Sequence, residues 1–357
     1  MGTTIISLNN YVRLLSTHVS CLLALLLLTT PTVFAQESPW LLIPTVSNDP
    51  KLGFKGGVMG GYLYKVDADS NFSMMGGFAN YSDTDSYTGG LFTDLYWGAN
   101  RNKLRAGIIN GHINNEYEDY LGTGQTVETE DNLKGLFIRY SHLIFPKWYL
   151  GAQFLSSNYA IGIDELTDEA AHQIGLTGFD SNGIGLVLEY DTRDNVRSST
   201  LGHYFNLNNI AYREGLGGDE SFDVFQADYR WFSPFGEGHV FALQLKGRWT
   251  SDAPQSGYSS LQLRGYTRGN YLDENYTHFD MEARIHLRGR WGATMFAGIS
   301  CLYSSMSDCG DNEDLFASAG AGITYVLKPA SGFIIKTEYA VGEKDNSAFY
   351  IKLGQKF

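Results

Sequence analysis

Polar and apolar residues alternate without a break over residues 278–288. The even positions carry only ionisable side chains, and the odd positions, from Phe279 to Leu287, carry only apolar ones. Because successive side chains of a strand point to opposite faces, this pattern predicts a strand with one charged and one apolar face. Such a strand fits a soluble sheet packed on a core. It fits equally a membrane barrel, whose apolar face meets lipid and whose charged face lines a wet lumen.

The connections between alternating segments favour the barrel. Similar alternation occurs at 225–231, 241–249, 333–341 and 349–357, and no helical period competes with it. Long connections near 116–131, 161–180, 212–221, 252–276, 304–313 and 342–347 take turns with short ones near 98–101, 146–147, 195–200, 234–238, 289–290 and 329–331. Membrane barrels have long extracellular loops and short periplasmic turns, whereas a sandwich has no reason to keep such parity.

Counting backward from Phe357 gives fifteen strands down to about Phe54, and residues 40–47 supply a sixteenth. We therefore predict an all-β fold, a 16-stranded antiparallel transmembrane β-barrel formed by one domain, residues 36–357. Pro44 lies in the first strand and cannot donate to a ladder, while Gly354 adds no side chain to the last. The junction of the first and last strands is thus expected to be weak. The alternative is simply a short first strand.

The N-terminal 35 residues resemble an export signal. Arg13 precedes a short apolar core at 21–28, and Ala35 ends a plausible cleavage site. The alternative, a membrane anchor, would need a longer core. We therefore predict a signal peptide at 1–35 and a multi-pass location in the bacterial outer membrane. In that oxidising route Cys301 and Cys309 are expected to form a disulfide at the neck of a loop, although two free thiols remain the alternative.

The amino-acid composition excludes further classes of protein. The chain has 357 residues, of which 41 are glycine and 23 tyrosine, and only 18% are charged. After the N-terminus no apolar run reaches the ~20 residues of a spanning helix, which excludes a polytopic helical protein. The formal net charge of -13 argues against a nucleic-acid partner.

Four local patterns and the chain end resemble one family. They are the segment at 183–195, the loop sequence at 263–266, the strand sequence at 282–284, the strand sequence at 296–298 and the end at 349–357. In this order and spacing they resemble the bacterial surface antigen superfamily, the barrel domain of BamA- and TamA-like proteins. The similarity is clear from about residue 183 to the end and thinner before it. Between Ala35 and the first strand we expect no POTRA modules, the soluble domains that receive clients in such machines.

The resemblance implies that the loop carrying Arg264, Gly265 and Tyr266 folds back into the barrel, where its arginine meets acidic and aromatic groups. The strand pattern offers a partner independently, because Glu282 and Asp280 lie on the charged face of the adjacent strand. Arginine suits bidentate pairing with carboxylates in a partly desolvated lumen. The alternative is that Arg264 is an ordinary solvated loop residue.

Phe296 and Gly298 form the matching strand motif, but many family members have aspartate where this chain has Gly298. We therefore expect Glu282 or Asp228 to hold more of the charge of Arg264. A further signature, the turn residues Asp191, Arg193 and Asp194, is predicted to brace the turn after its strand rather than to carry a function.

The sequence lacks the usual marks of an enzyme. It contains no Gly-x-Ser-x-Gly, no His-Glu-x-x-His and no Cys-x-x-Cys. His278 and His286 lie too far apart on one strand to share an ion, and the acidic loop at 308–314 fits no standard calcium spacing. We predict no enzymatic activity, no catalytic residues, no metal site and no cofactor.

Two functions remain open at this point. The first is help with the insertion or translocation of proteins at the outer membrane. The second is a passive structural or transport barrel with a loop-plugged lumen. The expected partners are outer-membrane lipid and lipopolysaccharide, client outer-membrane or secreted proteins, and the outer-membrane assembly machinery for the chain's own insertion.

Overall fold

The structure is a computed structural model that describes residues 38–49, 53–117, 127–159, 177–266, 270–310, 314–344 and 346–354. Its contacts separate Met1–Ser38 from Pro39–Phe357, and the second unit is the barrel. The predicted signal peptide, residues 1–35, lies outside the described residues.

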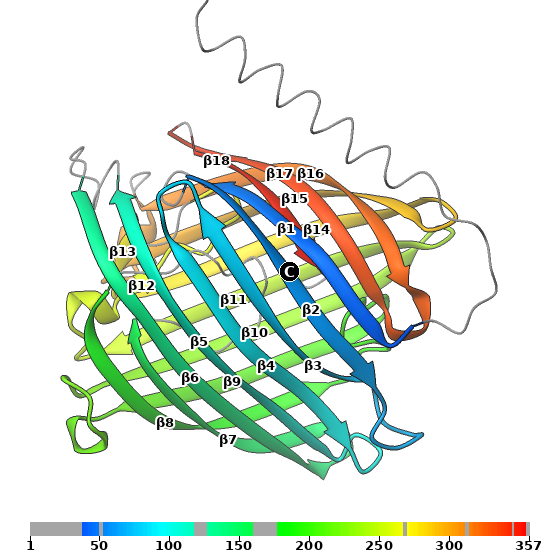
Figure 1. Cartoon of the computed structure of the whole chain (residues 1–357), viewed down its shortest axis with the longest axis horizontal. Coiled ribbons are helices and arrows are strands. Elements are labelled where there is room, and N and C mark those ends of the chain that lie inside the picture. Colours follow the sequence, from blue (N-terminus) through cyan, green and yellow to red (C-terminus); the bar gives the residue numbers. More distant parts are fainter. Residues whose placement is uncertain are drawn as a thin grey trace, which may run out of the picture. The chain divides into compact units, whose positions relative to one another are not determined.

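Sixteen antiparallel strands form the closed wall of the barrel (Figure 1), which confirms the predicted fold class. Each strand pairs with the next one along the chain, except that β11 pairs with β14 and β1 with β18. The wall strands are β1 (Trp40–Asp49), β2 (Gly53–Tyr64), β3 (Ser73–Ser82), β4 (Tyr87–Trp97), β5 (Asn102–Tyr117), β6 (Val127–Phe145), β7 (Trp148–Tyr159), β8 (Thr177–Asp191), β9 (Gly202–Tyr212), β10 (Phe222–Phe235), β11 (His239–Ser251), β14 (Asn275–Arg288), β15 (Trp291–Tyr303), β16 (Leu315–Lys328), β17 (Phe333–Gly342) and β18 (Ser347–Leu353).

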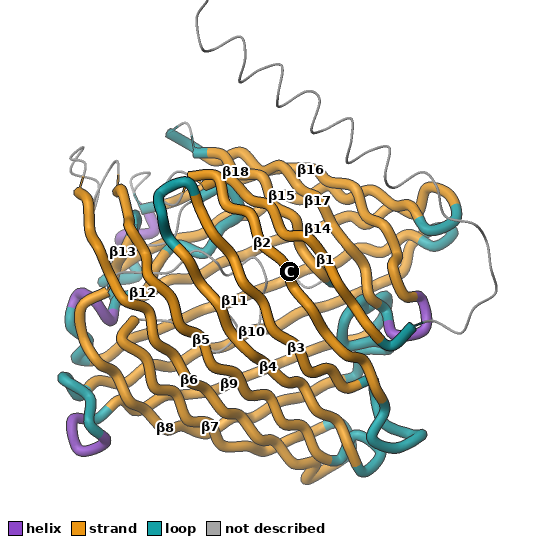
Figure 2. The backbone as a smooth tube through the Cα atoms, viewed as in Figure 1, coloured by secondary structure: helices purple, strands orange, loops and turns teal. Residues whose placement is uncertain are grey.

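The two ends of the barrel differ, but less regularly than the loop pattern predicts, because the β8–β9 connection, residues 192–201, is no shorter than the β9–β10 connection, residues 213–221. One end, which we call the long-loop end, carries the 3-10 helices η2 (Glu214–Leu216), η3 (Gln255–Gly257) and η4 (Asp308–Gly310). The other, the short-turn end, carries η5 (Pro329–Ser331) (Figure 2). Two short strands, β12 (Ser259–Ser260) and β13 (Leu272–Asp273), pair within the β11–β14 connection. No helix in the described ranges is long and apolar enough to cross a membrane.

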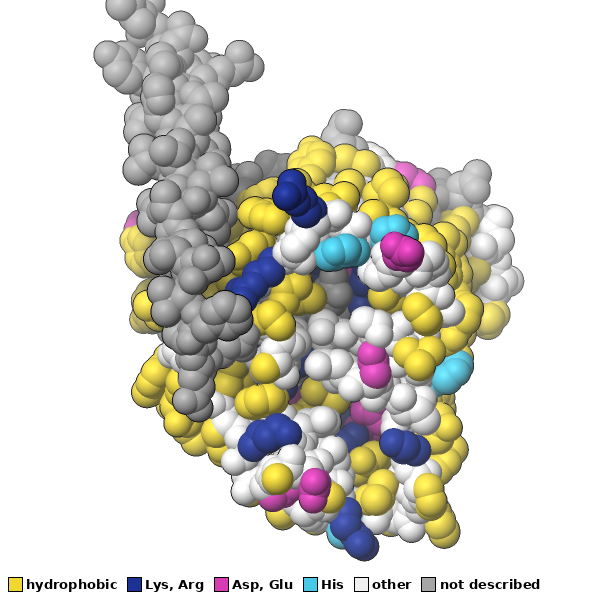
Figure 3. Space-filling view, turned by 90° about the vertical axis from the view of Figure 1, so that its right-hand side faces the viewer, with side chains coloured by type: hydrophobic (Ala, Val, Ile, Leu, Met, Phe, Trp, Pro, Cys, Tyr) yellow, Lys and Arg dark blue, Asp and Glu magenta, His cyan; other side chains and the backbone are white. Residues whose placement is uncertain are grey.

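The alternation of β14 places its charges inside the barrel. Asp280, Glu282 and Arg284 are buried on the inner face, whereas Met281 and Leu287 are 39% and 58% exposed on the outer face. In the view onto the short-turn end, hydrophobic side chains line both sides, and charged side chains are spread over the face between them (Figure 3). The lipid-facing interpretation of the pattern follows, because an apolar outer band surrounds a polar interior.

The junction of β1 and β18, which we call the seam, is sparsely paired. β1 pairs with β2 at ten positions, but with β18 at one, Asn48 opposite Phe349, among the described residues. Pro44 lies within β1 and brings no N–H to either neighbour. The prediction that Gly354 belongs to the last strand is wrong: β18 ends at Leu353, and Gly354 has a left-handed φ of 86° that takes the chain out of the extended conformation. Residues 355–357 lie outside the described part.

Candidate functional site

The connection between β11 and β14 folds into the lumen of the barrel. Leu261 and Leu263 of this loop are almost fully buried, and they pack with Tyr276, Leu302 and Phe316 of the wall. The apolar side of the loop therefore anchors it against the inner surface near the long-loop end. Its tip, residues 264–266, then enters the charged part of the lumen.

Arg264 at the tip contacts three carboxylates. Its Nη2 donates to Asp280 Oδ2 at 2.7 Å, and its Nη1 donates to Glu282 Oε2 at 2.8 Å and to Glu338 Oε1 at 3.1 Å. The guanidinium also lies 3.4 Å from the ring centroid of Phe296. Hydrogen bonds between ionised partners are about twice as strong as neutral ones, so this side chain fixes the loop to the wall.

The charges around Arg264 form a wider network, which we call the lumen network. Glu282 accepts from Arg284 Nε at 2.7 Å and from Lys336 Nζ at 3.2 Å. Lys336 lies 3.0 Å from Glu338, which is also 3.6 Å from Lys352 Nζ. Glu282 and Glu338 thus each face more than one cation, and such mutual pairing is what a buried charge requires.

Burial and charge act in opposite directions on Arg264. Burial by itself lowers the pKa of the guanidinium, but attraction by Asp280, Glu338 and Glu282 outweighs it and raises the pKa above its ordinary value. The loop tip therefore stays positively charged.

Gly265 and Tyr266 fasten the same tip to the last strands. Gly265 has a φ of 96°, a conformation that favours glycine, and its N–H donates to the Tyr350 hydroxyl at 2.9 Å. The Tyr266 hydroxyl donates to the carbonyl of Ala317 at 2.7 Å and accepts from the N–H of Glu343 at 2.7 Å. Burial raises the pKa of Tyr266, which keeps the hydroxyl protonated as a donor.

The structure brings most of the predicted loop and wall residues together, but not all. Asp280, Glu282 and Phe296 surround Arg264, whereas Asp228 accepts instead from Arg230 and Gln244 on its own side of the wall. The expectation that Asp228 helps to hold Arg264 is therefore wrong. Proximity along the chain could not show which inner carboxylates a loop tip would reach.

Glu338, and not Asp228 as the sequence suggested, is the third carboxylate that binds Arg264. It lies on the inner face of β17 and was visible as a polar position in the alternating segment 333–341. At Gly298, opposite Asp280 in the β14–β15 register, a Cβ would lie 2.8 Å from Leu263 Cδ1. The space for a side chain at 298 is thus filled by the inserted loop, and the third carboxylate comes from β17.

The predicted turn signature holds its own segment. Arg193 donates to both oxygens of Asp191 at 2.9 and 2.8 Å, and Lys103 lies 3.3 Å from the same carboxylate. The Asp194 carboxylate accepts from the backbone N–H groups of Thr200 at 2.9 Å and Leu201 at 3.2 Å. These contacts define the shape of residues 192–201 between β8 and β9.

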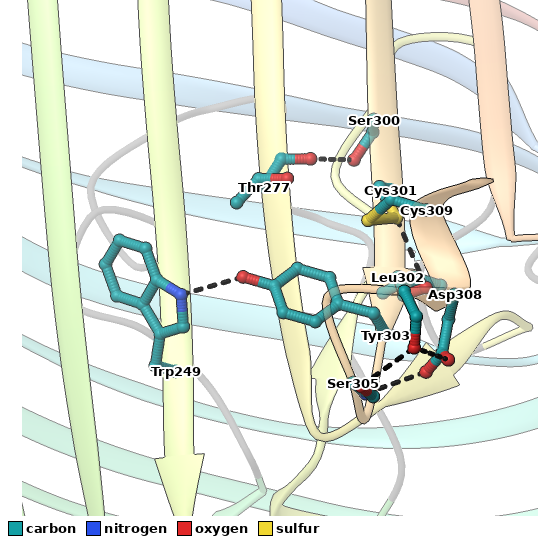
Figure 4. The surroundings of a disulfide bond; sticks show 10 residues. Trp249, Thr277, Ser300, Cys301, Leu302, Tyr303, Ser305, Asp308 and Cys309 are labelled. Carbon is teal, nitrogen blue, oxygen red and sulfur yellow. Dashed lines mark hydrogen bonds between the residues drawn. A yellow bond between two sulfur atoms is a disulfide. The ribbon is translucent and has the colours of Figure 1, made fainter.

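A disulfide joins Cys301, near the end of β15, to Cys309 in η4 (Figure 4), with their Cα atoms 5.7 Å apart. In the same loop Asp308 accepts from the N–H of Ser305 at 2.7 Å. In the part of the chain that the structure describes, no group of three or more histidine, cysteine or acidic side chains could hold a metal ion.

The fold and the inserted loop define an outer-membrane barrel of a known class. Residues 79–357 match the Omp85 superfamily domain, so the chain belongs to that superfamily, whose barrels lie in the bacterial outer membrane. The match confirms the resemblance to BamA-like barrels. Comparison with curated proteins gives no match.

Two solved structures illustrate the likeness. The crystal structure of BamA from Haemophilus ducreyi lacking POTRA domains 1–3 has 12% sequence identity and a TM-score of 0.52, covering 89% of this chain and 70% of that one. CdiB from Acinetobacter baumannii has 13% identity and a TM-score of 0.58, covering 88% of this chain and 59% of that one. At these identities the likeness concerns the fold.

Proposed function

We propose that this barrel assists the insertion or translocation of proteins at the outer membrane, without catalysis and without a cofactor. The observation that carries the proposal is the seam, where among the described residues β1 and β18 share one paired position while every other neighbouring pair of wall strands shares seven or more. Unpaired strand edges are templates for pairing with another strand. In a membrane such edges also lower stability, since each backbone group without a hydrogen bond costs several kcal/mol of free energy.

The inserted loop supports this proposal by making the two sides of the seam unequal. From one tip it reaches Glu282 on β14, Phe296 on β15, Ala317 on β16, Glu338 on β17 and Tyr350 on β18. Five consecutive strands on the last-strand side are thereby tied together. The side that begins with β1 receives no such contact from the described part of the tip, which suits a wall that opens at one place.

The seam can be locked to test the proposal. Asn48→Cys with Phe349→Cys joins the two residues that face each other across the seam, and Thr337→Cys with Ile351→Cys provides a matched cross-link between β17 and β18. Both variants and the unmodified protein are reconstituted in vesicles and given an unfolded outer-membrane protein as client. The unmodified protein, treated with the same oxidant and reductant, controls for the native disulfide.

Oxidation of the seam variant should abolish insertion of the client, reduction should restore it, and the β17–β18 cross-link should have no effect. In cells, depletion of the protein should lower the amounts of other outer-membrane or exported proteins. Full activity with a locked seam, together with an unchanged outer-membrane profile, would contradict the proposal.

The inserted loop also favours a second function, a passive barrel with a plugged lumen. In that case Arg264→Ala should convert small, unsteady currents in single-channel recordings into a larger steady conductance. Loss of client insertion in the locked-seam variant would argue against this alternative as the main role.

We also propose that residues 1–35 are an export signal and that the barrel domain begins near Gln36. N-terminal sequencing of the protein isolated from outer membranes should then start near this residue. The proposed partners are client proteins, outer-membrane lipid and lipopolysaccharide, and the machinery that inserts the barrel itself.

A further inference from the structure

Residues 192–201, which join β8 to β9 at the short-turn end, form a compact segment that we call the strap. The Asp194 carboxylate and the Asn195 amide oxygen hold it in shape, the latter by accepting from the N–H groups of Arg197 at 2.8 Å and Ser198 at 3.0 Å. Because side chains satisfy its backbone, the strap has a defined conformation without belonging to the sheet.

The strap begins on the wall opposite the seam. Six strands separate β8 from β1 in one direction around the ring, and six separate β9 from β18 in the other. In Figure 1, β8 accordingly lies low in the view and β18 high. Any contact between the strap and the strands near the seam must therefore cross the mouth of the barrel.

Arg197 makes that crossing and touches both sides of the seam. Its Nη2 donates to the carbonyl of Phe72 at 2.8 Å, in the β2–β3 turn on the first-strand side. Its guanidinium lies 4.9 Å from the ring centroid of Phe333, at the start of β17 on the last-strand side. Arg197 is only 8% exposed, so both contacts are shielded from water.

The ring of Phe333 carries the contact to the seam itself. It belongs to an apolar cluster with Leu41 and Ile43 of β1 and with Met59 and Leu63 of β2. From the lumen side Arg197 thus contacts the ring of Phe333, whose cluster joins β17 to β1. It does so across the seam, where backbone pairing between β1 and β18 is sparse. Because Arg197 and Phe333 are both buried, their contact can hold the two sides together where ladder hydrogen bonds between β1 and β18 are missing.

Gly332 leaves room for the strap beside the last strands, and Gly354 lies in ordinary contact with it. A Cβ at Gly332, in the β16–β17 turn, would lie 2.7 Å from the Asn195 side chain and 2.8 Å from Ser198 Oγ. A Cβ at Gly354, just after β18, would lie 3.6 Å from the carbonyl of Arg197. The left-handed glycine that ends β18 therefore sits beneath the strap.

The strap is also connected to the lumen network. Arg284 Nη1 donates to the carbonyl of Ser199 at 3.0 Å, and its Nε donates to Glu282, which holds Arg264. A continuous series of charge-assisted contacts therefore runs from the inserted loop at one level of the lumen to the strap at the short-turn end.

We propose that the strap is a clamp on the seam, in which Arg197 holds the first-strand and last-strand sides together at the short-turn end. Opening of the seam requires the release of this side chain from Phe72 and Phe333. Its biological role, control of the seam, rests on the function proposed above, but its structural effect does not. Arginine suits the position because one planar group donates to a carbonyl while its face covers a ring.

Hydrogen exchange measured on the full chain in phosphatidylcholine vesicles tests the clamp. In Arg197→Ala the amides of β1 and β18 should exchange about tenfold faster or more, as expected for loss of one charge-assisted hydrogen bond, while those of β10 stay unchanged. Arg197→Lys, which keeps the charge without the planar fork, should give an intermediate rate. Phe333→Leu, which keeps an apolar side chain but removes the ring, should also speed exchange at the seam.

Arg213→Ala is the matched control, since Arg213 also donates to backbone carbonyls, those of Tyr212 and Phe222, but between β9 and β10 at the other end. It should leave β1 and β18 unchanged. Heat-modified migration on gels selects folded protein for each variant. Unchanged exchange at the seam in Arg197→Ala, or an equal rise in every strand, would overturn the clamp.

Client insertion separates the clamp from the proposed function. Faster exchange at the seam in Arg197→Ala supports the clamp even where the locked-seam experiment shows no role in insertion. Conversely, unchanged exchange overturns the clamp even where the locked seam abolishes insertion.

Discussion

Removal of Arg264 tests whether the inserted loop is held by charge. In Arg264→Ala, Glu282 keeps Arg284 and Lys336, and Glu338 keeps Lys336 and Lys352. The consequence therefore falls on Asp280, because the remaining ionic contact of this carboxylate in the described residues is His278 Nε2 at 3.9 Å.

The expected loss of stability in Arg264→Ala follows from the carboxylate of Asp280, which loses its arginine partner. Removing one partner of a buried ion pair costs about 3–5 kcal/mol in a dry interior. Asp280 is only 5% exposed in its side chain, but the charge of Lys336 still attracts it, which places the expected loss of unfolding free energy near the lower limit, about 3 kcal/mol. Loss of the contact with Phe296 adds about 1 kcal/mol.

Urea titration of the protein folded in short-chain phospholipid vesicles, followed by tryptophan fluorescence, measures this loss as a shift of the unfolding midpoint. Arg264→Ala combined with Asp280→Asn should recover about 1–2 kcal/mol, because the orphaned charge is gone. Arg213→Ala is the control: Arg213 and its partner Asp223 are 42% and 36% exposed, so their pair should contribute about 1 kcal/mol or less.

The reasoning would be refuted if Arg264→Ala and Arg213→Ala shifted the midpoint equally. It would also be refuted if Asp280→Asn made the Arg264→Ala protein less stable rather than more. Either result would mean that packing of the loop, and not pairing with Asp280, holds the tip in place.

Three further outcomes are expected. Gly298→Asp should destabilise the barrel by about 2 kcal/mol and expose the loop to trypsin, since its Cβ would lie 2.8 Å from Leu263; wild-type resistance would contradict this. Gly265→Ala should cost about 1–2 kcal/mol in the urea titration because alanine is strained at a φ of 96°, whereas an unchanged midpoint would mean that the tip adopts another conformation. Replacing Cys301 and Cys309 together by serine should lower stability by about 2–3 kcal/mol, as expected for a loop closed over a sequence separation of 8, and the wild-type protein after reduction should match it.

Much of the architecture follows from local pattern. The period-two alternation of β14 places Asp280 and Glu282 on the same inner face, and adjacency of this strand to the loop makes Glu282 a predictable partner of Arg264. The alternation of long and short connections indicates the two ends of the barrel, although residues 192–201 at the short-turn end and 83–86 at the other end depart from it. These features depend on residues close in the chain, so the sequence is sufficient for them.

Contacts across the lumen are of another kind. Glu338 reaches Arg264 from three strands beyond β14, Asp228 is taken by Arg230 instead, and Arg197 meets Phe72 although 125 residues separate them. Such meetings depend on how the ring of strands closes and how far each connection turns inward, which no local pattern records. The sequence by itself determined the strands, their faces and the nearest charge partner of Arg264. The tertiary structure decided the third carboxylate, the sparsely paired seam and the strap that contacts both of its sides, because closing the barrel brings together residues that are distant in the chain.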